Sequence, residues 1–260
     1  MSEPLLFEIT DRIARITLDR AENGNALTSQ TVRLLEAAVA QLESQPAVRV
    51  VVLAANGPTF SAGGDIVDFV RAGDDLAAMI DRELLRLHAT LRRLYELSKA
   101  IVCALNGAVA GGAIGFALSA DVVIAAESAR FRGGYSALGL SPDLGTSFFL
   151  TRSIGPQRTT EFLFSNRQLD AHEALALGLV ARVVPDAELA AETQFLAEAL
   201  AAVAPGSIAG IKAVVRAAQS ASFAEVLDLE REWIVRNASS PECRDAIRAF
   251  VERRAANAVR

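Results

Sequence analysis

Two glycine-rich turns decide how this chain can fold: Phe60-Ser-Ala-Gly-Gly-Asp65 and Asn106-Gly-Ala-Val-Ala-Gly-Gly112. Each turn follows an apolar, strand-like run and precedes a helical pattern, which predicts a tight connection from strand to helix. Such connections leave backbone N–H groups without a helical partner. Two N–H groups that point at one oxygen form an oxyanion hole, which stabilises an enolate or a tetrahedral intermediate. The two turns therefore predict carbonyl or thioester chemistry.

Strands and helices alternate on both sides of these turns. Residues 48–54, 101–105 and 122–126 are apolar runs of the kind found in strands buried on both faces. The pattern predicts an α/β fold. Further strands are expected at residues 5–9, 13–18 and 179–184, and helices at residues 30–42, 76–97, 111–118, 146–153, 159–164 and 171–177.

The pattern becomes purely helical from about residue 186 onward. We therefore place a boundary near residue 195, with an α/β core in residues 1–195 and a helical region in residues 196–260. At 260 residues and 52% hydrophobic content, the chain is large enough for one core plus an appendage.

Composition argues against several classes of protein. The net charge of −5 disfavours a nucleic-acid binder, because phosphate contacts need clustered Lys and Arg. Two cysteines and two histidines argue against a disulfide framework and a metal site. The start of the chain lacks the pattern of a signal peptide, so we expect a cytoplasmic protein. Residues 100–120 are uncharged and long enough to span a membrane, but Asn106 and four glycines predict a buried strand, turn and helix instead.

Five sequence elements resemble the crotonase (enoyl-CoA hydratase/isomerase) superfamily in order and spacing. They are Asn25-Ala-Leu-Thr28, the two glycine-rich turns, the strand beginning Asp121-Val-Val-Ile, and Ala176-Leu-Gly-Leu-Val180. The resemblance implies a crotonase-like spiral of ββα units with a C-terminal helical trimerisation domain, assembled as a homotrimer or homohexamer. It also implies acyl-CoA thioester substrates, with coenzyme A entering as part of the substrate and no separate cofactor.

The resemblance also implies which residues form the site. Gly64 and Gly112 would supply the two N–H groups of the oxyanion hole, and Gly112 lies where a helix is expected to begin. Arg253 resembles a basic residue that reaches CoA phosphate groups. The remaining residues implied to contact CoA are Ala26, Leu27, Ala62, Gly63, Asp65 and Ile66, of which Ala62 and Ile66 would lie near the adenine.

The chain departs from the hydratase pattern at two positions. Hydratases of this superfamily use two glutamates to activate water, and the matching positions here are Gly115 and Tyr135. Neither residue acts as a general acid or base near neutral pH, since the ordinary tyrosine pKa is about 10. Efficient hydration is therefore not expected.

Asp143 supplies a different carboxylate. The segment Leu138-Gly-Leu-Ser-Pro-Asp143 resembles the isomerase branch of the superfamily, which includes 1,2-epoxyphenylacetyl-CoA isomerase. We expect Leu140, Leu144 and Phe148 to surround the carboxylate and raise its pKa by desolvation. One such carboxylate could move a proton between C2 and C4 of an enoyl thioester. In an alternative interpretation, Asp143 only caps a helix that begins near Thr146.

The leading hypothesis is thus an enoyl-CoA isomerase with Asp143 as acid/base, whose acyl pocket includes walls from residues 68–85. Three alternatives stay open: a hydratase-like enzyme, a non-catalytic homologue that binds CoA or RNA, and an enzyme resembling 4-chlorobenzoyl-CoA dehalogenases. The last would use Asp143 as nucleophile and His88 to activate water, although His88 could simply pack beside Leu84 and Leu91.

Tyr135 could line the acyl pocket, hydrogen-bond the substrate or be an ordinary core aromatic.

Overall fold

The computed structural model describes residues 3–258. The chain divides into two compact units, Met1–Ala201 and Ala202–Arg260. The first unit contains every strand of the two sheets, and the second is helical. The boundary expected near residue 195 falls inside helix α7 (Leu189–Ala201), and the units divide at the end of that helix.

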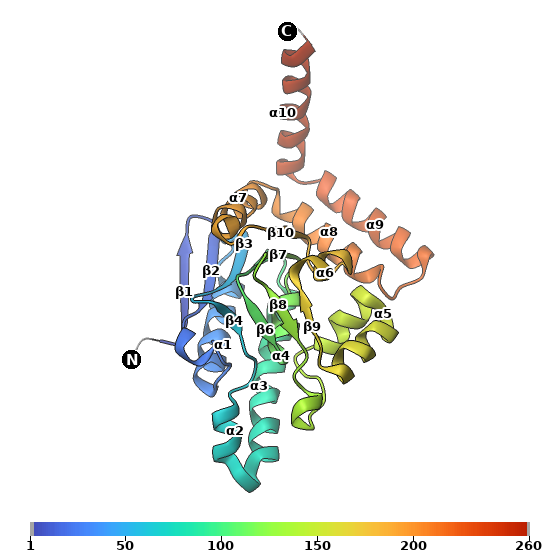
Figure 1. The fold of residues 1–260 in the computed structure, drawn as a ribbon. Helices are drawn as coiled ribbons and strands as arrows, with labels where there is room; N and C mark the ends of the chain where they lie inside the picture. The colour runs from blue at the N-terminus through green and yellow to red at the C-terminus, as the bar shows by residue number, and fades with distance from the viewer. Residues whose placement is uncertain (1–2, 259–260) are drawn as a thin grey trace. The chain divides into compact units, whose positions relative to one another are not determined.

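A six-stranded sheet has the order β1-β2-β3-β5-β7-β10 (Figure 1). Strands β1 and β2 form the expected antiparallel hairpin, and the other pairings are parallel. All six residues of β5 are buried, which explains its continuous apolar sequence. The strands are β1 (Leu5–Thr10), β2 (Ile13–Leu18), β3 (Val50–Ala55), β5 (Ala100–Leu105), β7 (Val122–Ala126) and β10 (Arg182–Val184).

A second sheet has four short strands in the order β4-β6-β8-β9. Each of the pairs β3–β4, β5–β6 and β7–β8 places one strand in each sheet before the chain enters a helix (Figure 1). This repeat confirms the predicted spiral of ββα units. The four strands are β4 (Thr59–Ser61), β6 (Ala108–Ala110), β8 (Arg130–Arg132) and β9 (Gln168–Asp170).

The helices of the first unit follow the predicted order. The two helices expected at residues 146–153 and 159–164 are the two halves of α5, which is broken at Gly155, where φ is 78° and ψ is 163° and Pro156 follows. Two differences are found: helix α2 was not predicted, and strand β10 is shorter than the strand expected at residues 179–184. The helices are α1 (Ser29–Ser44), α2 (Ile66–Ala72), α3 (Leu76–Glu96), α4 (Gly112–Leu118), α5 (Thr146–Ser165), α6 (Ala171–Ala176) and α7.

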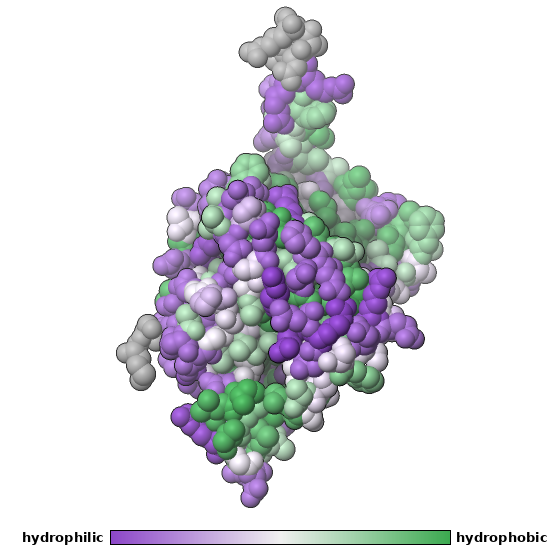
Figure 2. Space-filling model, viewed as in Figure 1, coloured by the Kyte–Doolittle hydropathy of each residue, from purple (hydrophilic) through white to green (hydrophobic). Residues whose placement is uncertain are grey.

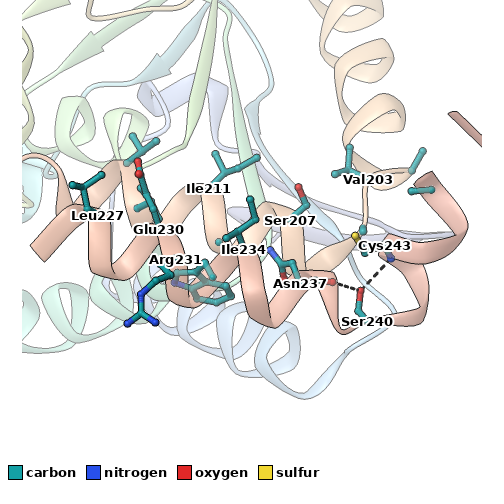
Figure 3. Close-up of a pocket in the computed structure, with 17 residues that line it drawn as sticks. Val203, Ser207, Ile211, Leu227, Glu230, Arg231, Ile234, Asn237, Ser240 and Cys243 are labelled. Atoms are coloured by element: carbon teal, nitrogen blue, oxygen red, sulfur yellow. Dashed lines mark hydrogen bonds between the residues drawn. The ribbon is translucent and has the colours of Figure 1, made fainter. Parts of the chain in front are cut away.

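The second unit consists of α8 (Pro205–Ala217), α9 (Phe223–Ala238) and α10 (Pro241–Ala258). Helices α8 and α9 form an apolar groove of about 930 Å³ (Figure 3). Ile211 and Ile234 line this groove and are 61% and 69% exposed in the single chain. The α8–α9 groove is therefore an uncovered apolar surface.

Residues 100–120 form β5, β6 and α4, as expected for a buried segment that is no membrane span. Within residues 3–258, no single helix is long and apolar enough to cross a membrane. Two consecutive helices have, when taken together, the length and composition of a membrane span, although a break separates them. They are Asp186–Ala201 and Pro205–Ala217.

Candidate active site

The two glycine-rich turns pack against each other. Gly63 has a φ of 87°, and a Cβ at this position would lie only 2.8 Å from the carbonyl oxygen of Ala110 in the second turn. The Leu27 N–H donates to the Gly63 carbonyl oxygen over 2.8 Å, and Leu27 pairs with Gly64. Glycine is thus required here because the two backbones approach so closely.

Both predicted oxyanion glycines carry an N–H group for which residues 3–258 supply no acceptor. Within the described part of the chain, no hydrogen-bond partner is found for the N–H of Gly64 or of Gly112. Asp65 holds the first turn in place, since its carboxylate accepts from Val67 N over 2.9 Å at the start of α2. It also lies 3.1 Å from the Arg20 guanidinium. Asp65 therefore has a structural task next to the predicted oxyanion hole.

A cavity of about 80 Å³ brings Gly64, Gly112 and Asp143 together. Its other walls come mainly from α2 and α3, which confirms the expectation that residues 68–85 contribute to the pocket. The remaining residues that line it are Leu27, Thr28, Ser29, Val32, Asp65, Asp68, Phe69, Met79, Ile80, Glu83, Leu84, Leu87 and Leu144. The cavity therefore places the Asp143 carboxylate in the same space as Gly64 and Gly112, together with the acidic side chains of Asp65, Asp68 and Glu83 and a largely apolar remainder.

The Asp143 carboxylate does not cap helix α5. The N-cap residue is Gly145, without a side-chain cap, and Thr146 N donates to the backbone carbonyl of Asp143 over 2.8 Å. The carboxylate instead accepts a hydrogen bond of 2.6 Å from the Tyr135 hydroxyl. A Cβ built on Gly112 would meet Asp143 Oδ1, so the carboxylate lies directly against the second turn. The capping interpretation is wrong.

Burial raises the pKa of Asp143, while the hydrogen bond from Tyr135 and the nearby His88 oppose this change. Leu144 is buried next to it, as expected. Leu140 and Phe148 are 38% and 40% exposed, and Phe148 contacts the ring of Phe149. The predicted direction of the pKa change is confirmed, but the apolar neighbours come largely from α3.

Tyr135 lies outside the set of residues that line the cavity. Its buried hydroxyl donates to Asp143, accepts from Asp143 N over 3.3 Å and lies 3.2 Å from the Thr146 hydroxyl. Burial raises the pKa of Tyr135, and the Asp143 carboxylate raises it further. This position gives no support to a direct role in substrate binding. It makes Tyr135 a partner of the carboxylate.

His88 also contacts the segment that carries Asp143. Its side chain is exposed, and its Nε2 accepts a hydrogen bond of 3.3 Å from Leu144 N. Leu144 has a φ of 47°, an uncommon backbone conformation for this residue type. The expectation that His88 only packs beside Leu84 and Leu91 is therefore wrong. His88 helps to hold the strained residue that follows the carboxylate.

Gly115 stands at the position of the first hydratase glutamate, and backbone atoms of Leu144 and Thr146 occupy the space that a side chain there would need. A Cβ at Gly115 would meet the carbonyl oxygen of Leu144, and it would lie 2.7 Å from Thr146 N. Gly115 N donates to the Thr146 hydroxyl over 3.2 Å. No side chain fits at Gly115 unless the segment bearing Asp143 moves.

The other residues implied to bind CoA are found on or near the first turn and in the second unit. Ala26 is buried, Ala62 is exposed, and Ile66 is half-exposed at the start of α2. Figure 2 shows an apolar patch over α2, the helix on which Ile66, Val67 and Val70 are exposed. Arg253 is exposed on α10 of the second unit. Their contacts with CoA stay predictions.

Several polar residues of the cavity, Thr28, Ser29, Asp68 and Glu83, were not identified as site residues from the sequence. Glu83 lies on α3 near Ile80, Leu84 and Leu87, which form the apolar stripe of that helix. A glutamate next to an apolar stripe was a usable signal, because charged residues normally occupy the opposite face.

Comparison with known proteins gives a consistent result. The sequence pattern of the family described as Enoyl-CoA hydratase/isomerase matches residues 8–258. The 1,2-epoxyphenylacetyl-CoA isomerase of Escherichia coli (strain K12) is 32% identical over 258 residues, covering 98% of this chain and 97% of that protein. The trans-2-decenoyl-[acyl-carrier-protein] isomerase of Streptococcus mutans is 32% identical over 252 residues, covering 96% and 95%. The crystal structure of an enoyl-CoA hydratase from Polaromonas sp. JS666 superposes with a TM-score of 0.91 at 29% identity, covering 96% and 97%.

The chain belongs to the enoyl-CoA hydratase/isomerase family of enzymes, the crotonase superfamily. The relatives include both isomerases and hydratases, so family membership leaves the reaction open.

Proposed function

We propose that this enzyme is an acyl-CoA isomerase that moves the double bond of an enoyl thioester. The observation that carries the proposal is the position of Asp143, whose carboxylate lies against Gly112 in the cavity that also contains Gly64. The positions that match the two hydratase glutamates hold Gly115 and Tyr135. A carboxylate that lies against Gly112, without the pair of hydratase glutamates, suits proton transfer on one face of a substrate better than activation of water.

In the proposed mechanism, the thioester carbonyl oxygen accepts hydrogen bonds from Gly64 N and Gly112 N. Polarisation of the carbonyl acidifies C2, and Asp143 removes a proton from C2 of a 3-enoyl thioester. The resulting dienolate carries its charge on the thioester oxygen, where the two N–H groups stabilise it. Asp143 then returns the proton to C4, which leaves the double bond between C2 and C3.

The desolvation of Asp143 fits this task. Because burial raises its pKa, the carboxylate is a stronger base than an exposed aspartate when it is ionised. The apolar walls of the cavity also exclude water from the dienolate, which would favour return of the proton over side reactions.

The test follows the ultraviolet absorbance of the conjugated enoyl thioester with 3-enoyl-CoA and 2-enoyl-CoA in parallel. We expect the band to appear from 3-enoyl-CoA and to persist with 2-enoyl-CoA. Asp143→Asn should lower kcat by on the order of 100-fold or more, while CoA binding persists. Rapid loss of the band from 2-enoyl-CoA, or full activity of Asp143→Asn, would overturn the proposal.

A dehalogenase-like reaction is the second candidate, because His88 contacts the residue next to Asp143. In that reaction Asp143 would attack an aryl ring and His88 would activate the water that cleaves the ester. The lone pair of His88 Nε2 is already engaged by Leu144 N, which favours the isomerase. Release of halide from a 4-halobenzoyl-CoA, lost in His88→Ala, would support the second candidate.

We also propose that the chain assembles through its second unit as a homotrimer, or as a homohexamer of two trimers. The exposed apolar lining of the α8–α9 groove supports this proposal, since large apolar surfaces on soluble proteins commonly mark interfaces.

A further inference from the structure

Thr146 carries a hydroxyl group whose contacts the proposed mechanism does not use. The residue is the first of α5 and is fully buried. Its Oγ1 donates to the Gly111 carbonyl oxygen over 3.3 Å and accepts from Gly115 N over 3.2 Å. The Tyr135 hydroxyl lies 3.2 Å from the same oxygen. Thr146 therefore joins the second glycine-rich turn to the segment that bears the proposed base.

The contact with Gly111 bears on the oxyanion hole, because the Gly111 carbonyl and the Gly112 N–H belong to one peptide unit. This unit is trans and planar, so its C=O and N–H groups point in opposite directions. Ile114 N, in the first turn of α4, donates to the same carbonyl over 3.1 Å. The Thr146 hydroxyl adds a donor from a different helix, α5. It therefore fixes the peptide unit against α5, and with it the direction of the Gly112 N–H.

Thr146 also holds the residue that bears the carboxylate. Its backbone N–H donates to the Asp143 carbonyl over 2.8 Å. The Tyr135 hydroxyl, next to the Thr146 hydroxyl, donates to the Asp143 carboxylate over 2.6 Å. A misplacement of about 1 Å between reacting groups can lower a rate on the order of 100-fold. The spacing between the oxyanion donor and the base therefore depends on the contacts of one residue.

We propose that Thr146 is a positioning residue that aims the Gly112 N–H at the thioester oxygen and keeps it in register with Asp143. The inference rests on the proposed isomerase function. Thr146 does not line the cavity, so it acts through the peptide unit that it holds and not by touching the substrate.

The first test compares variants of Thr146 by initial rates with 3-enoyl-CoA. Thr146→Val keeps the shape of the side chain and removes the hydroxyl. We expect kcat to fall by roughly 10- to 100-fold, less than for complete loss of an oxyanion donor, with little change in KM. Thr146→Ser keeps the hydroxyl and should restore most of kcat.

The same helix offers a matched control. Thr159 is also buried in α5, and its hydroxyl donates to the Gly155 carbonyl over 2.9 Å. Thr159→Val removes the same kind of hydrogen bond away from the site and should leave kcat as in the wild type. Should Thr146→Val fail to fold, Thr146→Ala and Thr159→Ala make the same comparison.

A second measurement does not depend on turnover. Infrared difference spectra give the carbonyl stretching frequency of a bound saturated acyl-CoA with an isotopically labelled thioester carbonyl. Hydrogen bonds from an oxyanion hole lower this frequency, because polarisation weakens the C=O bond. We expect the wild type, Thr146→Ser and Thr159→Val to lower it equally, and Thr146→Val to lower it less.

An equal frequency in Thr146→Val and the wild type would overturn the proposal, and so would equal kcat values for Thr146→Val and Thr159→Val. A wild type that leaves the frequency at its value in solution would also overturn it, since Gly112 N would then meet no carbonyl. A wild type that lowers the frequency but does not convert 3-enoyl-CoA would overturn the isomerase proposal alone. The frequencies of the variants would still decide the task of Thr146.

Discussion

Tyr135 and Asp143 form the shortest polar contact in the site, 2.6 Å between hydroxyl and carboxylate oxygen. The bond stabilises the charged form of Asp143 and so opposes the effect of burial on its pKa. It also fixes the direction of the carboxylate, since Asp143 N donates back to the same hydroxyl over 3.3 Å. Tyr135 is therefore a positioning residue that adjusts both the aim and the basicity of the proposed base.

Tyr135→Phe should move the acid limb of the kcat/KM–pH profile to higher pH. The variant lacks the hydrogen bond that lowers the Asp143 pKa, so a higher pH is needed to ionise the carboxylate. Above that limb, kcat should fall by on the order of tenfold, because the carboxylate is less well aimed. Initial rates with 3-enoyl-CoA across the pH range measure both effects.

The chain offers a matched control for this change. Tyr95 is the other of its two tyrosines and lies outside the cavity lining, with its ring against Phe149. Tyr95→Phe should leave the pH profile where it is. An acid limb that stays in place in Tyr135→Phe would show that the hydroxyl does not influence the base.

Asp143 should also weaken the fold at neutral pH. Because burial raises its pKa, the folded chain holds the proton more tightly than the unfolded chain does. Stability then falls as pH rises from the unfolded value of about 3.9 through the raised folded value, and stays level above it. Asp143→Asn removes the titration, so its unfolding free energy should exceed that of the wild type at pH 7.

Urea unfolding of both proteins at a series of pH values measures this difference, which should shrink as the pH is lowered toward 4. Asp74→Asn, at an exposed position ahead of α3, serves as the control and should behave like the wild type throughout. A difference for Asp143→Asn that does not vary with pH would contradict the explanation.

At the scale of elements, the long strands and helices were predictable because their side chains carry a clear pattern. Strands β3, β5 and β7 and the amphipathic α3 all have runs long enough to show it. Strands β4, β6, β8 and β9 have three residues each, which is too short for a period to emerge. Their pairing depends on the sheet that surrounds them.

Only part of the candidate site was predictable from the sequence. The glycine turns and Asp143 could be found because each is local in the sequence. The bond between Tyr135 and Asp143 joins residues eight positions apart and depends on how the chain turns before α5. The contact of His88 with Leu144 and the position of Glu83 in the cavity depend on α3 being brought against that turn. No local pattern encodes contacts between distant segments of this kind.

Packing between α4 and the start of α5 leads to a prediction at Gly115. Replacing a helical glycine by alanine normally stabilises a helix by up to about 1 kcal/mol. Here a Cβ would meet the carbonyl oxygen of Leu144, so Gly115→Ala should instead destabilise the protein by about 1–3 kcal/mol. Chemical denaturation measures the change.

Activity should fall in the same variant, since the displaced Leu144 adjoins Asp143. Gly115→Glu should likewise fail to hydrate 2-enoyl-CoA, although it restores a glutamate of the hydratase pattern. A stable, hydrating Gly115→Glu variant would show that the segment around Leu144 adapts more readily than its contacts indicate.

At the scale of the whole molecule, the two units have different roles in the proposals. The first unit contains every residue assigned to the oxyanion hole and to proton transfer. The second unit carries Arg253, implied to bind CoA phosphate, and the α8–α9 groove. Assembly and catalysis can therefore be tested separately.

Ile234→Asp should disrupt assembly, because a carboxylate in the α8–α9 groove would lose its hydration on contact with a second chain. Sedimentation equilibrium of the wild type should give three or six times the chain mass of 27.5 kDa, and the variant should shift toward the mass of one chain. Leu85→Asp is the control, since Leu85 is equally exposed, at 68%, but lies on α3 in the first unit.

Two results would show that the groove is not the interface. One is a wild type that is monomeric, and the other is an Ile234→Asp variant that has the same assembled mass as Leu85→Asp. Full isomerase activity in a monomeric Ile234→Asp variant would then place the whole reaction within one chain.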